Sequence, residues 1–113
     1  MDKEISWQDF EKINIRAGTI TAVNHFAKAR KPAWQLTIDF GGEIGVKRSS
    51  AQITRFYSAE DLIGRQVIAV INFPPKQIAG FISECLVLGA YDENNDVILL
   101  QPSQPVKNGR PIG

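Results

Sequence analysis

The chain has 113 residues, 43% of them hydrophobic and 22% charged, which fits one soluble globular domain over residues 1–113 and argues against wholesale disorder. Its net charge of +1 excludes a protein that is strongly basic or acidic throughout, and no apolar stretch is long enough to span a bilayer. Cys85 is the only cysteine, which excludes an intrachain disulfide and a cysteine-rich metal site and, with no signal-peptide pattern at the N-terminus, favours the cytoplasm.

The N-terminal segment predicts a short helix over residues 7–12. Ser6 is a good N-cap, and Asp9 completes a capping box, in which side chains and backbone satisfy each other's hydrogen bonds. Ile5 and Phe10 occupy the two positions of a hydrophobic staple, the apolar contact that often brackets such a cap.

The segment that follows predicts three strands separated by a loop and a turn. Residues 15–23 favour a strand with a β-bulge at Gly18, and the polar, basic run 25–32 favours a loop. Residues 34–40 alternate apolar and polar side chains, which is typical of a strand with one buried face. A glycine pair then turns the chain into a third strand over 44–48.

Residues 49–64 interrupt the β pattern and predict a second short helix. Ser58 and Asp61 repeat the capping-box spacing, and Gly64 suits the end of the helix because it readily adopts a positive φ.

Three further strands are expected at 66–73, 84–91 and 97–101, the first of them central because it is apolar on both faces. Short strands with one helical interruption favour an all-β fold with short helices, namely an OB-fold, a five-stranded Greek-key barrel that binds oligonucleotides on one face. An SH3-like barrel is the alternative from the strand pattern alone. The helical segment between the third and fourth strands favours the OB-fold.

The connection between the fourth and fifth strands carries the most specific pattern in the chain. A proline pair stops the strand, because proline has no N–H to donate to the ladder, and polar residues follow at fixed positions. Loops that hold such residues beside a sheet commonly bind ligands. The candidate binding residues of this loop are Lys76, Gly80, Ser83 and Glu84.

A second polar segment, residues 47–57, combines cations with hydroxyl and amide groups. Cations attract phosphates, and hydroxyls and amides can bond phosphates, 2′-hydroxyls or base edges. Alternatively, Ser49 or Ser50 caps the following helix, and both roles are compatible because a helix N-terminus is itself an anion site. The RNA-binding candidates here are Lys47, Arg48, Ser49, Ser50, Gln52 and Arg55.

Charge is unevenly distributed along the chain. Residues 16–76 carry a net charge of +5, whereas residues 1–15 and residues 77–113 each carry −2. A basic middle between acidic ends is what a phosphate-binding face needs, and the alternative is a solvated surface with chance clustering.

Catalytic and metal chemistry have little support in the sequence. His25 is the only histidine, so no zinc site is expected, and no motif supports a catalytic triad. Cys85 lies in an apolar strand, which favours a buried, inert thiol. Trp7 and Trp34 could be stacking platforms, although the alternation places Trp34 toward the core. We expect no enzyme activity, no metal and no cofactor.

Three motifs in order carry a family resemblance: IRAGTI at 15–20, KRSSAQIT at 47–54 and NFPPKQIAGFISECLVLG at 72–89. Together they resemble the free-standing tRNA-binding domain proteins, most closely the CsaA type of export-related chaperone. The wider family includes C-terminal domains of methionyl-tRNA synthetases and a module of phenylalanyl-tRNA synthetase β chains. The likeness covers nearly the whole chain.

The resemblance implies an OB barrel, a homodimer, and recognition of tRNA by shape and backbone contacts. Synthetase-type members often carry more basic residues in the third motif, where this chain keeps only Lys76, so we expect modest, salt-sensitive RNA binding. The positions that the resemblance assigns to the RNA surface are Lys47, Ser49, Ser50, Gln52, Lys76, Gly80, Ser83 and Glu84.

The resemblance also implies an alternative function, binding of unfolded or preprotein peptides, which can coexist with RNA binding. Such a role needs an exposed apolar groove. The candidate groove residues are Phe26, Phe56, Tyr57 and Phe81. A third possibility is an appendage that acts in trans with a synthetase.

Both ends of the chain, residues 1–14 and 101–113, extend beyond the predicted barrel and are expected at a dimer interface. The alternative is that each end caps its own barrel. The candidate interface residues are Ile5, Trp7, Phe10, Val106 and Ile112.

Overall fold

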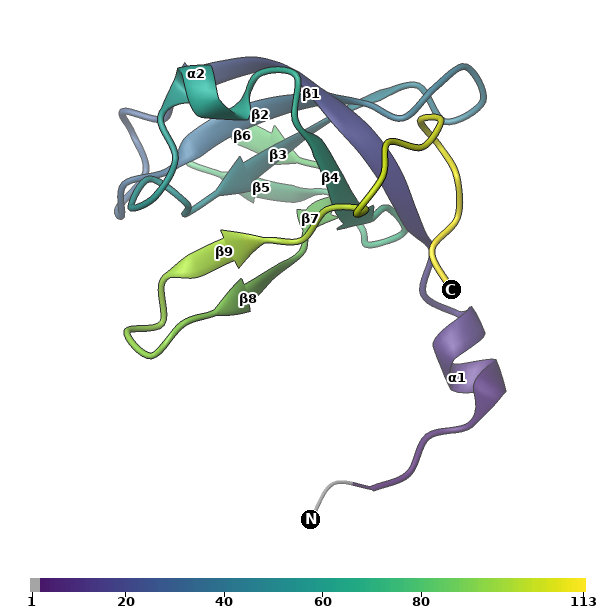
Figure 1. The fold of residues 1–113 in the computed structure, drawn as a ribbon. Helices are drawn as coiled ribbons and strands as arrows, with labels where there is room; N and C mark the ends of the chain where they lie inside the picture. Colours follow the sequence, from purple (N-terminus) through teal and green to yellow (C-terminus); the bar gives the residue numbers. More distant parts are fainter. Residues whose placement is uncertain (1–2) are drawn as a thin grey trace.

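The computed structural model describes residues 3–113 and contains a five-stranded antiparallel sheet that curls into a nearly closed, OB-like barrel (Figure 1). The strand order in this sheet is β3-β2-β1-β4-β7, and two further hairpins, β5–β6 and β8–β9, lie outside it. A helix between the third and fourth strands is present, as the sequence predicts. The elements are α1 (Trp7–Glu11), β1 (Ile15–His25), β2 (Trp34–Asp39), β3 (Val46–Ala51), α2 (Ala59–Leu62), β4 (Gln66–Val70), β5 (Lys76–Ile78), β6 (Phe81–Ser83), β7 (Leu86–Val87), β8 (Gly89–Tyr91) and β9 (Val97–Leu99).

Strand β1 is the centre of the sheet because its N-terminal half pairs with β4 and its C-terminal half pairs with β2. The ladder with β2 is irregular between Ile20 and Ala22, so the bulge expected at Gly18 is wrong. Gly18 instead makes room for the core, because a Cβ at this position would lie 2.7 Å from the ring of Phe40.

Strand β3 begins later and continues further than the sequence predicts. The preceding turn occupies residues 41–45, in which Gly41 and Gly45 have positive φ angles of 91° and 83°. The strand then includes Ser49 and Ser50, which pair with β2. The alternative that one of these serines caps the next helix is therefore wrong, because both are strand residues.

The two predicted helices are present and both carry the predicted capping box. The hydroxyl oxygens of Ser6 and Ser58 accept hydrogen bonds from the backbone N–H groups of Asp9 and Asp61, at 3.1 and 3.2 Å. Helix α2 packs against the barrel and buries Leu62 completely, whereas α1 buries none of its residues.

The barrel interior holds the main hydrophobic core. Trp34 packs against it, as the alternation predicts, and its indole N–H donates to the carbonyl of Tyr57 at 3.0 Å. The buried core residues are Ile20, Leu36, Ile38, Phe40, Ile53, Leu62, Val67, Ala69, Cys85 and Leu99.

The single strand predicted over 84–91 is wrong, because the chain changes partners within it and forms the two short strands β7 and β8. The N–H of Leu88 donates to Ile68 of β4, while the carbonyl of Leu88 accepts from the N–H of Leu100 beyond β9. Gly89 stands at this change because a Cβ there would lie 2.8 Å from the carbonyl oxygen of Ile98.

The C-terminal segment joins its own barrel. The N–H of Ala17 in β1 donates to the carbonyl of Arg110 at 3.1 Å, and the N–H of Gly109 donates to the carbonyl of Ala17 at 2.8 Å. The N–H of Ile112 donates to the carbonyl of Ile15 at 2.9 Å. The tail thus covers the edge of β1 that β2 leaves open (Figure 1).

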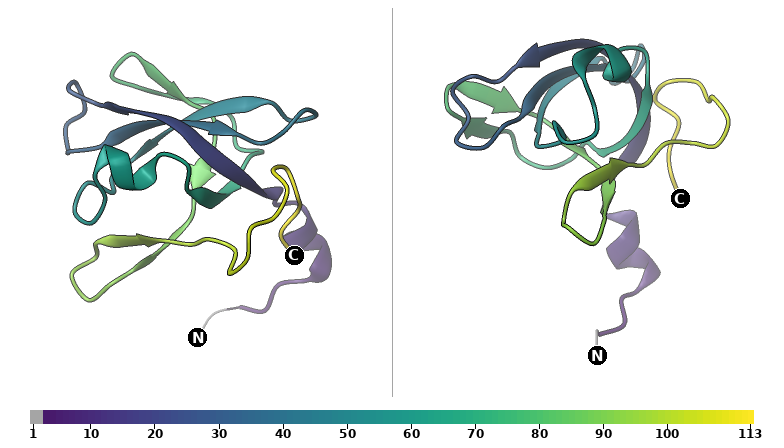
Figure 2. Two further views of the ribbon diagram at one scale, coloured as in Figure 1. Left: turned by 45° about the horizontal axis from the view of Figure 1, so that its top comes forward. Right: turned by 60° about the vertical axis from the view of Figure 1, so that its left-hand side comes forward.

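The N-terminal helix α1 projects from the barrel, as Figure 1 and the right-hand view of Figure 2 show. The side chain of Asn72 holds the connection of this helix to β1: it accepts from the N–H of Asn14 at 2.9 Å and donates to the carbonyl of Lys12 at 2.7 Å. The first two residues of the expected N-terminal extension lie outside the described residues.

Candidate functional site

The two polar segments that the sequence singles out meet each other, and their contact closes the barrel. We call this contact the closing seam: residues 48–50 of β3 against residues 83–85, which precede β7. The N–H of Glu84 donates to the carbonyl of Arg48 at 2.8 Å, and the N–H of Arg48 donates to Oε1 of Glu84 at 3.0 Å. The seam therefore holds the backbone of Arg48 through both its N–H and its carbonyl.

The serines of the two segments belong to the same seam. Ser49 is 1% exposed, and its hydroxyl donates to the carbonyl of Cys85 at 2.9 Å. The N–H of Ser50 donates to the hydroxyl oxygen of Ser83 at 3.2 Å. The hydroxyl of Ser49 is consequently committed to closing the barrel and does not face a ligand.

Cys85 lies on the inner side of the seam as a free, buried thiol. Burial raises the pKa of this thiol to about 11, and the negative charge of Glu84 acts in the same direction. The positive charge of Lys47 acts the other way and lowers the pKa. The thiol is therefore protonated near neutral pH, which makes it a poor nucleophile.

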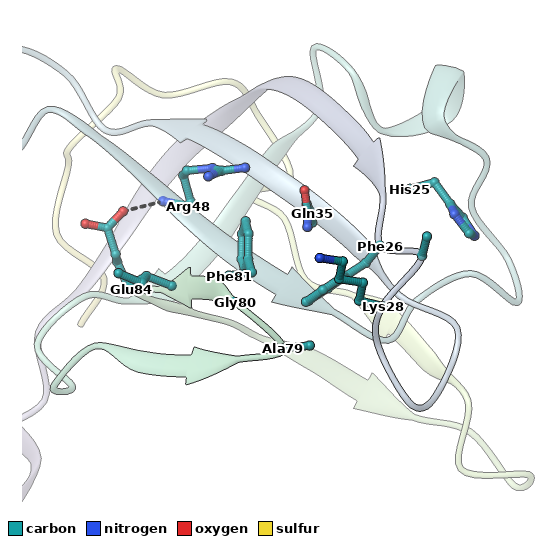
Figure 3. A pocket seen from close by; sticks show the side chains of 11 residues that line it. His25, Phe26, Lys28, Gln35, Arg48, Ala79, Gly80, Phe81 and Glu84 are labelled. Carbon is teal, nitrogen blue, oxygen red and sulfur yellow. Dashed lines mark hydrogen bonds between the residues drawn. The ribbon is translucent and has the colours of Figure 1, made fainter.

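A cavity of about 690 Å³ lies on the outer face of the barrel beside the closing seam (Figure 3). Its walls are the loop after β1, outward-facing side chains of β2 and β3, and the β5–β6 hairpin, an element that the sequence does not predict. The polar residues that line it are His25, Lys28, Gln35, Arg48 and Glu84.

The floor of this cavity is aromatic. Phe26 and Phe81 are 4% and 5% exposed, and their ring centroids lie 5.3 Å apart in a small core of their own. The guanidinium of Arg48 lies over the ring of Phe81, 4.4 Å from its centroid (Figure 3). The two phenylalanines are thus floor residues, whereas the sequence predicted them at the rim of an exposed groove.

The guanidinium of Arg48 forms no ion pair within the described part of the chain. The ion pairs found there join Lys12 to Asp9 and Arg55 to Asp96, and neither involves the cavity. Arg48 is exposed on the outer side of β3, so its guanidinium can meet a ligand.

Three polar lining residues were not predicted as site residues: His25, Lys28 and Gln35. Two of them were within reach of sequence reasoning, because His25 and Lys28 lie in the basic loop 25–32. Gln35 alternates with buried neighbours in β2 and so faces outward. What the sequence did not show is that this loop, β2 and the hairpin meet.

The tip of the β5–β6 hairpin is a tight turn at the mouth of the cavity. Ala79 and Gly80 have φ angles of 47° and 84°, the positive values that two-residue hairpin turns of the type I′ class require. Gly80 adopts such an angle freely, but Ala79 does so at a steric cost. Gly80 is therefore the unstrained residue of this turn.

Lys47 and Lys76 do not line the cavity. Lys47 is partly buried on the same side of β3 as Ser49, because side chains alternate along a strand. Lys76 lies beside a separate, more apolar hollow of about 450 Å³ next to the closing seam. We call this second feature the apolar hollow, and its apolar lining residues are Phe73, Pro74, Ile78, Cys85 and Leu86.

The remaining candidates of the second segment lie elsewhere. Arg55 is ion-paired with Asp96 at 3.6 Å, and its guanidinium lies 5.8 Å from the centroid of Phe56, which is 47% exposed. The hydroxyl of Tyr57 accepts from the N–H of Leu99 at 3.0 Å, so this ring is tied to the core. Gln52 is exposed and lines neither cavity nor hollow.

All the candidate interface residues except Val106 lie together at the chain ends, and two of them are strongly exposed. Ile5 and Trp7 are 69% and 74% exposed, although Trp7 contacts Phe10 with 5.8 Å between ring centroids. Ile112 lines a shallow hollow together with α1, whereas Val106 is 40% exposed and lies apart from it. We call the surface of Ile5, Trp7, Phe10 and Ile112 the terminal patch.

Residues 3–113 contain neither a metal-binding cluster nor a helix that could span a membrane. No three histidine, cysteine, aspartate or glutamate side chains come together as a metal ion would require. No helix in the described range is long and apolar enough to cross a membrane.

Comparison with known proteins identifies relatives along almost the whole chain. Residues 15–111 match the family described as "Putative tRNA binding domain". The chain is 34% identical over 108 residues to the methionine–tRNA ligase of Pyrococcus furiosus, an alignment that covers 96% of this chain. It spans only 14% of the length of that ligase.

Solved structures give a closer likeness over full length. The chaperone CsaA of Bacillus anthracis is 52% identical, with a TM-score of 0.92 over 98% of this chain and 100% of the other. The CsaA chaperone protein of Picrophilus torridus is also 52% identical, with a TM-score of 0.91 over 97% and 100% of the two chains.

Proposed function

This chain belongs to the tRNA-binding domain family, and on that premise we propose that it is a non-enzymatic OB-fold homodimer that binds tRNA by shape and backbone contacts. Because its relatives among the ligases are enzymes by virtue of a much longer chain, the catalytic activity of those proteins is not transferred to this one. We place the protein in the cytoplasm, where tRNA is found.

The observation that carries the proposal is the position of the basic cavity. OB-folds bind oligonucleotides on the face of their second and third strands, between the loop joining the first two strands and the loop joining the last two. In this barrel those elements are the outer face of β2 and β3, the loop after β1, and the β5–β6 hairpin. The cavity with Lys28 and Arg48 lies among all of them.

The mechanism that follows is electrostatic attraction with little base recognition. Cationic side chains neutralise backbone phosphates and release counterions, and the RNA helix is recognised through its shape and its 2′-hydroxyls. We assign the main contacts to Lys28 and Arg48, with Lys76 extending the surface along the hairpin. Gln52 and Arg55 contact the RNA only if the bound RNA extends past the C-terminal end of β3.

The test is the affinity for tRNA measured across a series of salt concentrations. The logarithm of the binding constant should fall linearly with the logarithm of the salt concentration, because bound phosphates displace counterions. Lys28→Ala and Lys76→Ala should each weaken binding and reduce that slope by about one. Lys107→Ala, a matched removal of an exposed lysine outside this surface, is the control. Affinity independent of salt would refute the proposal.

The proposed homodimer is supported by the terminal patch. Monomers rarely leave side chains as large as Ile5 and Trp7 exposed together, and an isologous contact would cover the patch on both copies. Sedimentation equilibrium of the wild type and of Trp7→Glu tests this proposal. We expect a dimer that the substitution weakens, while a monomeric wild type at micromolar concentration would exclude it.

A second function, binding of unfolded peptides, is favoured by the two 52% identical structures, both of proteins called chaperones. The apolar hollow beside Phe73 and Leu86 is the surface that fits it, because both side chains are more than 45% exposed. Suppression of aggregation of an unfolded client should weaken in Leu86→Glu. If that variant suppresses aggregation fully, or the wild type does not suppress it at all, the apolar hollow is not a peptide-binding surface.

A further inference from the structure

We propose that the cavity of Figure 3 holds one unstacked nucleotide of the bound RNA, with its base on the guanidinium of Arg48 and its phosphate toward Lys28. This inference rests on the proposed tRNA binding and deepens it. It turns a surface of general phosphate attraction into a site for a single nucleotide.

The stacking surface is preorganised before any RNA arrives. The backbone of Arg48 is held by two hydrogen bonds to Glu84, and the central carbon of its guanidinium lies over the Phe81 ring, 4.4 Å from the centroid. Phe81 is in turn fixed by its contact with Phe26. A base that stacks on the cavity side of the guanidinium would complete a three-layer stack, and guanidinium planes are recognised platforms for unstacked RNA bases.

The cavity has the size and the polarity for this occupant. Its volume of about 690 Å³ falls in the range that is usual for small-molecule sites. Gln35 offers an amide that can both donate to and accept from a base edge. Lys28 and Glu84 are held by different walls, since Lys28 is in the loop after β1 and Glu84 is in the closing seam with Arg48 (Figure 3).

This separation orients the nucleotide. A phosphate near Glu84 would be repelled, whereas a phosphate near Lys28 would be attracted. The base is then directed toward Arg48, whose cation also favours the π face of a base.

The strained residue at the mouth of the cavity supports a ligand site. Ala79 has a φ of 47°, a conformation that asparagine and glycine adopt more readily. Ala79 lines the cavity, so an asparagine there would relieve strain but reduce the space available to a ligand. Strained positions of this kind persist at ligand-binding sites.

The experiment uses the full-length protein and a single-stranded RNA trinucleotide, with a trinucleotide lacking only the central base as the second probe. The wild type should bind the intact probe about tenfold more tightly than the abasic one, the loss expected for one stacked base. Arg48→Lys keeps the charge and removes the planar stack, so it should erase this difference. Equal binding of the two probes by the wild type, or an unchanged difference in Arg48→Lys, would overturn the proposal.

Two variants of Ala79 separate cavity space from folding. Ala79→Gly and Ala79→Asn should both be at least as stable as the wild type, because both relieve the strained φ. Ala79→Gly should bind the intact trinucleotide as the wild type does, whereas Ala79→Asn should bind it several-fold more weakly. Undiminished binding by a stable Ala79→Asn would contradict occupancy of this cavity.

The results distinguish this inference from the proposed function. Salt-dependent tRNA binding without any preference for the intact trinucleotide would leave tRNA binding standing and refute the nucleotide site. Base-dependent trinucleotide binding without tRNA binding would support the nucleotide site and refute the proposed function. Competition of an unfolded peptide for the cavity, with no effect of the base, would assign the cavity to the second function and refute the nucleotide site.

Discussion

The two sides of strand β3 differ in what they contact, although their residues alternate along one short segment. On the inner side, Ser49 is buried and bonded to Cys85, and Lys47 is partly buried. On the outer side, Arg48 is exposed and lines the cavity, and the side chain of Ser50 borders the apolar hollow. The inner side closes the barrel, and the outer side faces ligands.

This difference shows why a polar run in a strand cannot be read as one binding segment. Successive side chains of a strand point to opposite faces, so two adjacent cations or two adjacent serines have different surroundings. A lysine and an arginine that look equivalent in the sequence are separated by the sheet itself. Paired substitutions at adjacent residues of β3 test that separation.

The largest expected effect distinguishes the two adjacent serines. Ser49→Ala should lower the free energy of unfolding by about 1–3 kcal/mol, because the buried carbonyl of Cys85 loses its partner. Ser50→Ala should change it by less than about 0.5 kcal/mol, since in the seam Ser50 contributes its backbone N–H. Urea denaturation of both variants measures the difference. Equal losses would mean that the two sides are not distinct.

The second prediction distinguishes the two adjacent cations by their effect on tRNA. Arg48→Ala should weaken tRNA binding about tenfold, because it removes both a phosphate-attracting charge and a stacking surface. Lys47→Ala should weaken it less than about threefold, because Lys47 lies on the inner side and contributes only at a distance. Filter binding or calorimetry at one fixed salt concentration provides the comparison. If Lys47→Ala weakens tRNA binding more than Arg48→Ala does, the RNA surface does not lie on the outer side of β3.

The third prediction concerns Glu84, which belongs to both the seam and the cavity. Glu84→Gln keeps an oxygen that can accept from the N–H of Arg48 and removes a negative charge from the cavity wall. Affinity for tRNA should rise by up to about fivefold at low salt, the size expected for one partly exposed charge. The gain should disappear at high salt. Weaker binding by this variant would mean that the carboxylate contacts the RNA directly.

The smallest effect, which appears only at alkaline pH, is expected from ionisation of the Cys85 thiol on the inner side. Its pKa is raised by burial to about 11, above the ordinary value of 9.0, so the folded state favours the protonated thiol. The thiol therefore contributes its full stability below about pH 9, and that contribution is lost as pH rises from about 9 to about 11. Unfolding free energies of the wild type and of Cys85→Ala, measured across this window, should converge. If the unfolding free energies of the two proteins instead change in parallel with pH, ionisation of the Cys85 thiol is not the cause of the loss of stability.

Much of the fold follows from local patterns in the sequence. The capping boxes at Ser6 and Ser58 begin both helices, and the alternation over residues 34–40 places β2 with Trp34 toward the core. The bulge at Gly18 was misplaced because glycine was interpreted through its backbone freedom. Its actual role is to give space to Phe40, a residue distant in the sequence.

The candidate site was predicted less completely, because its residues come from elements that local patterns do not connect. Arg48 and Gly80 were identified from their own segments, and both line the cavity. Lys28 and Gln35 were missed, since nothing near them in the sequence indicates that the β5–β6 hairpin folds over them. The hairpin itself was hidden by its short strands, each only three residues long.

The sequence by itself determined the local features of this protein. These are the strand and helix periods, the turns, the helix caps, and a basic middle segment with two polar motifs. Only the tertiary structure decided how those motifs are used. When the barrel closes, Ser49 is buried against the carbonyl of Cys85, while Arg48 is left on the outer face above Phe81. The physical reason is that adjacent side chains of a strand always point to opposite faces of the sheet, but only long-range strand pairing decides which of the two faces is buried in the barrel.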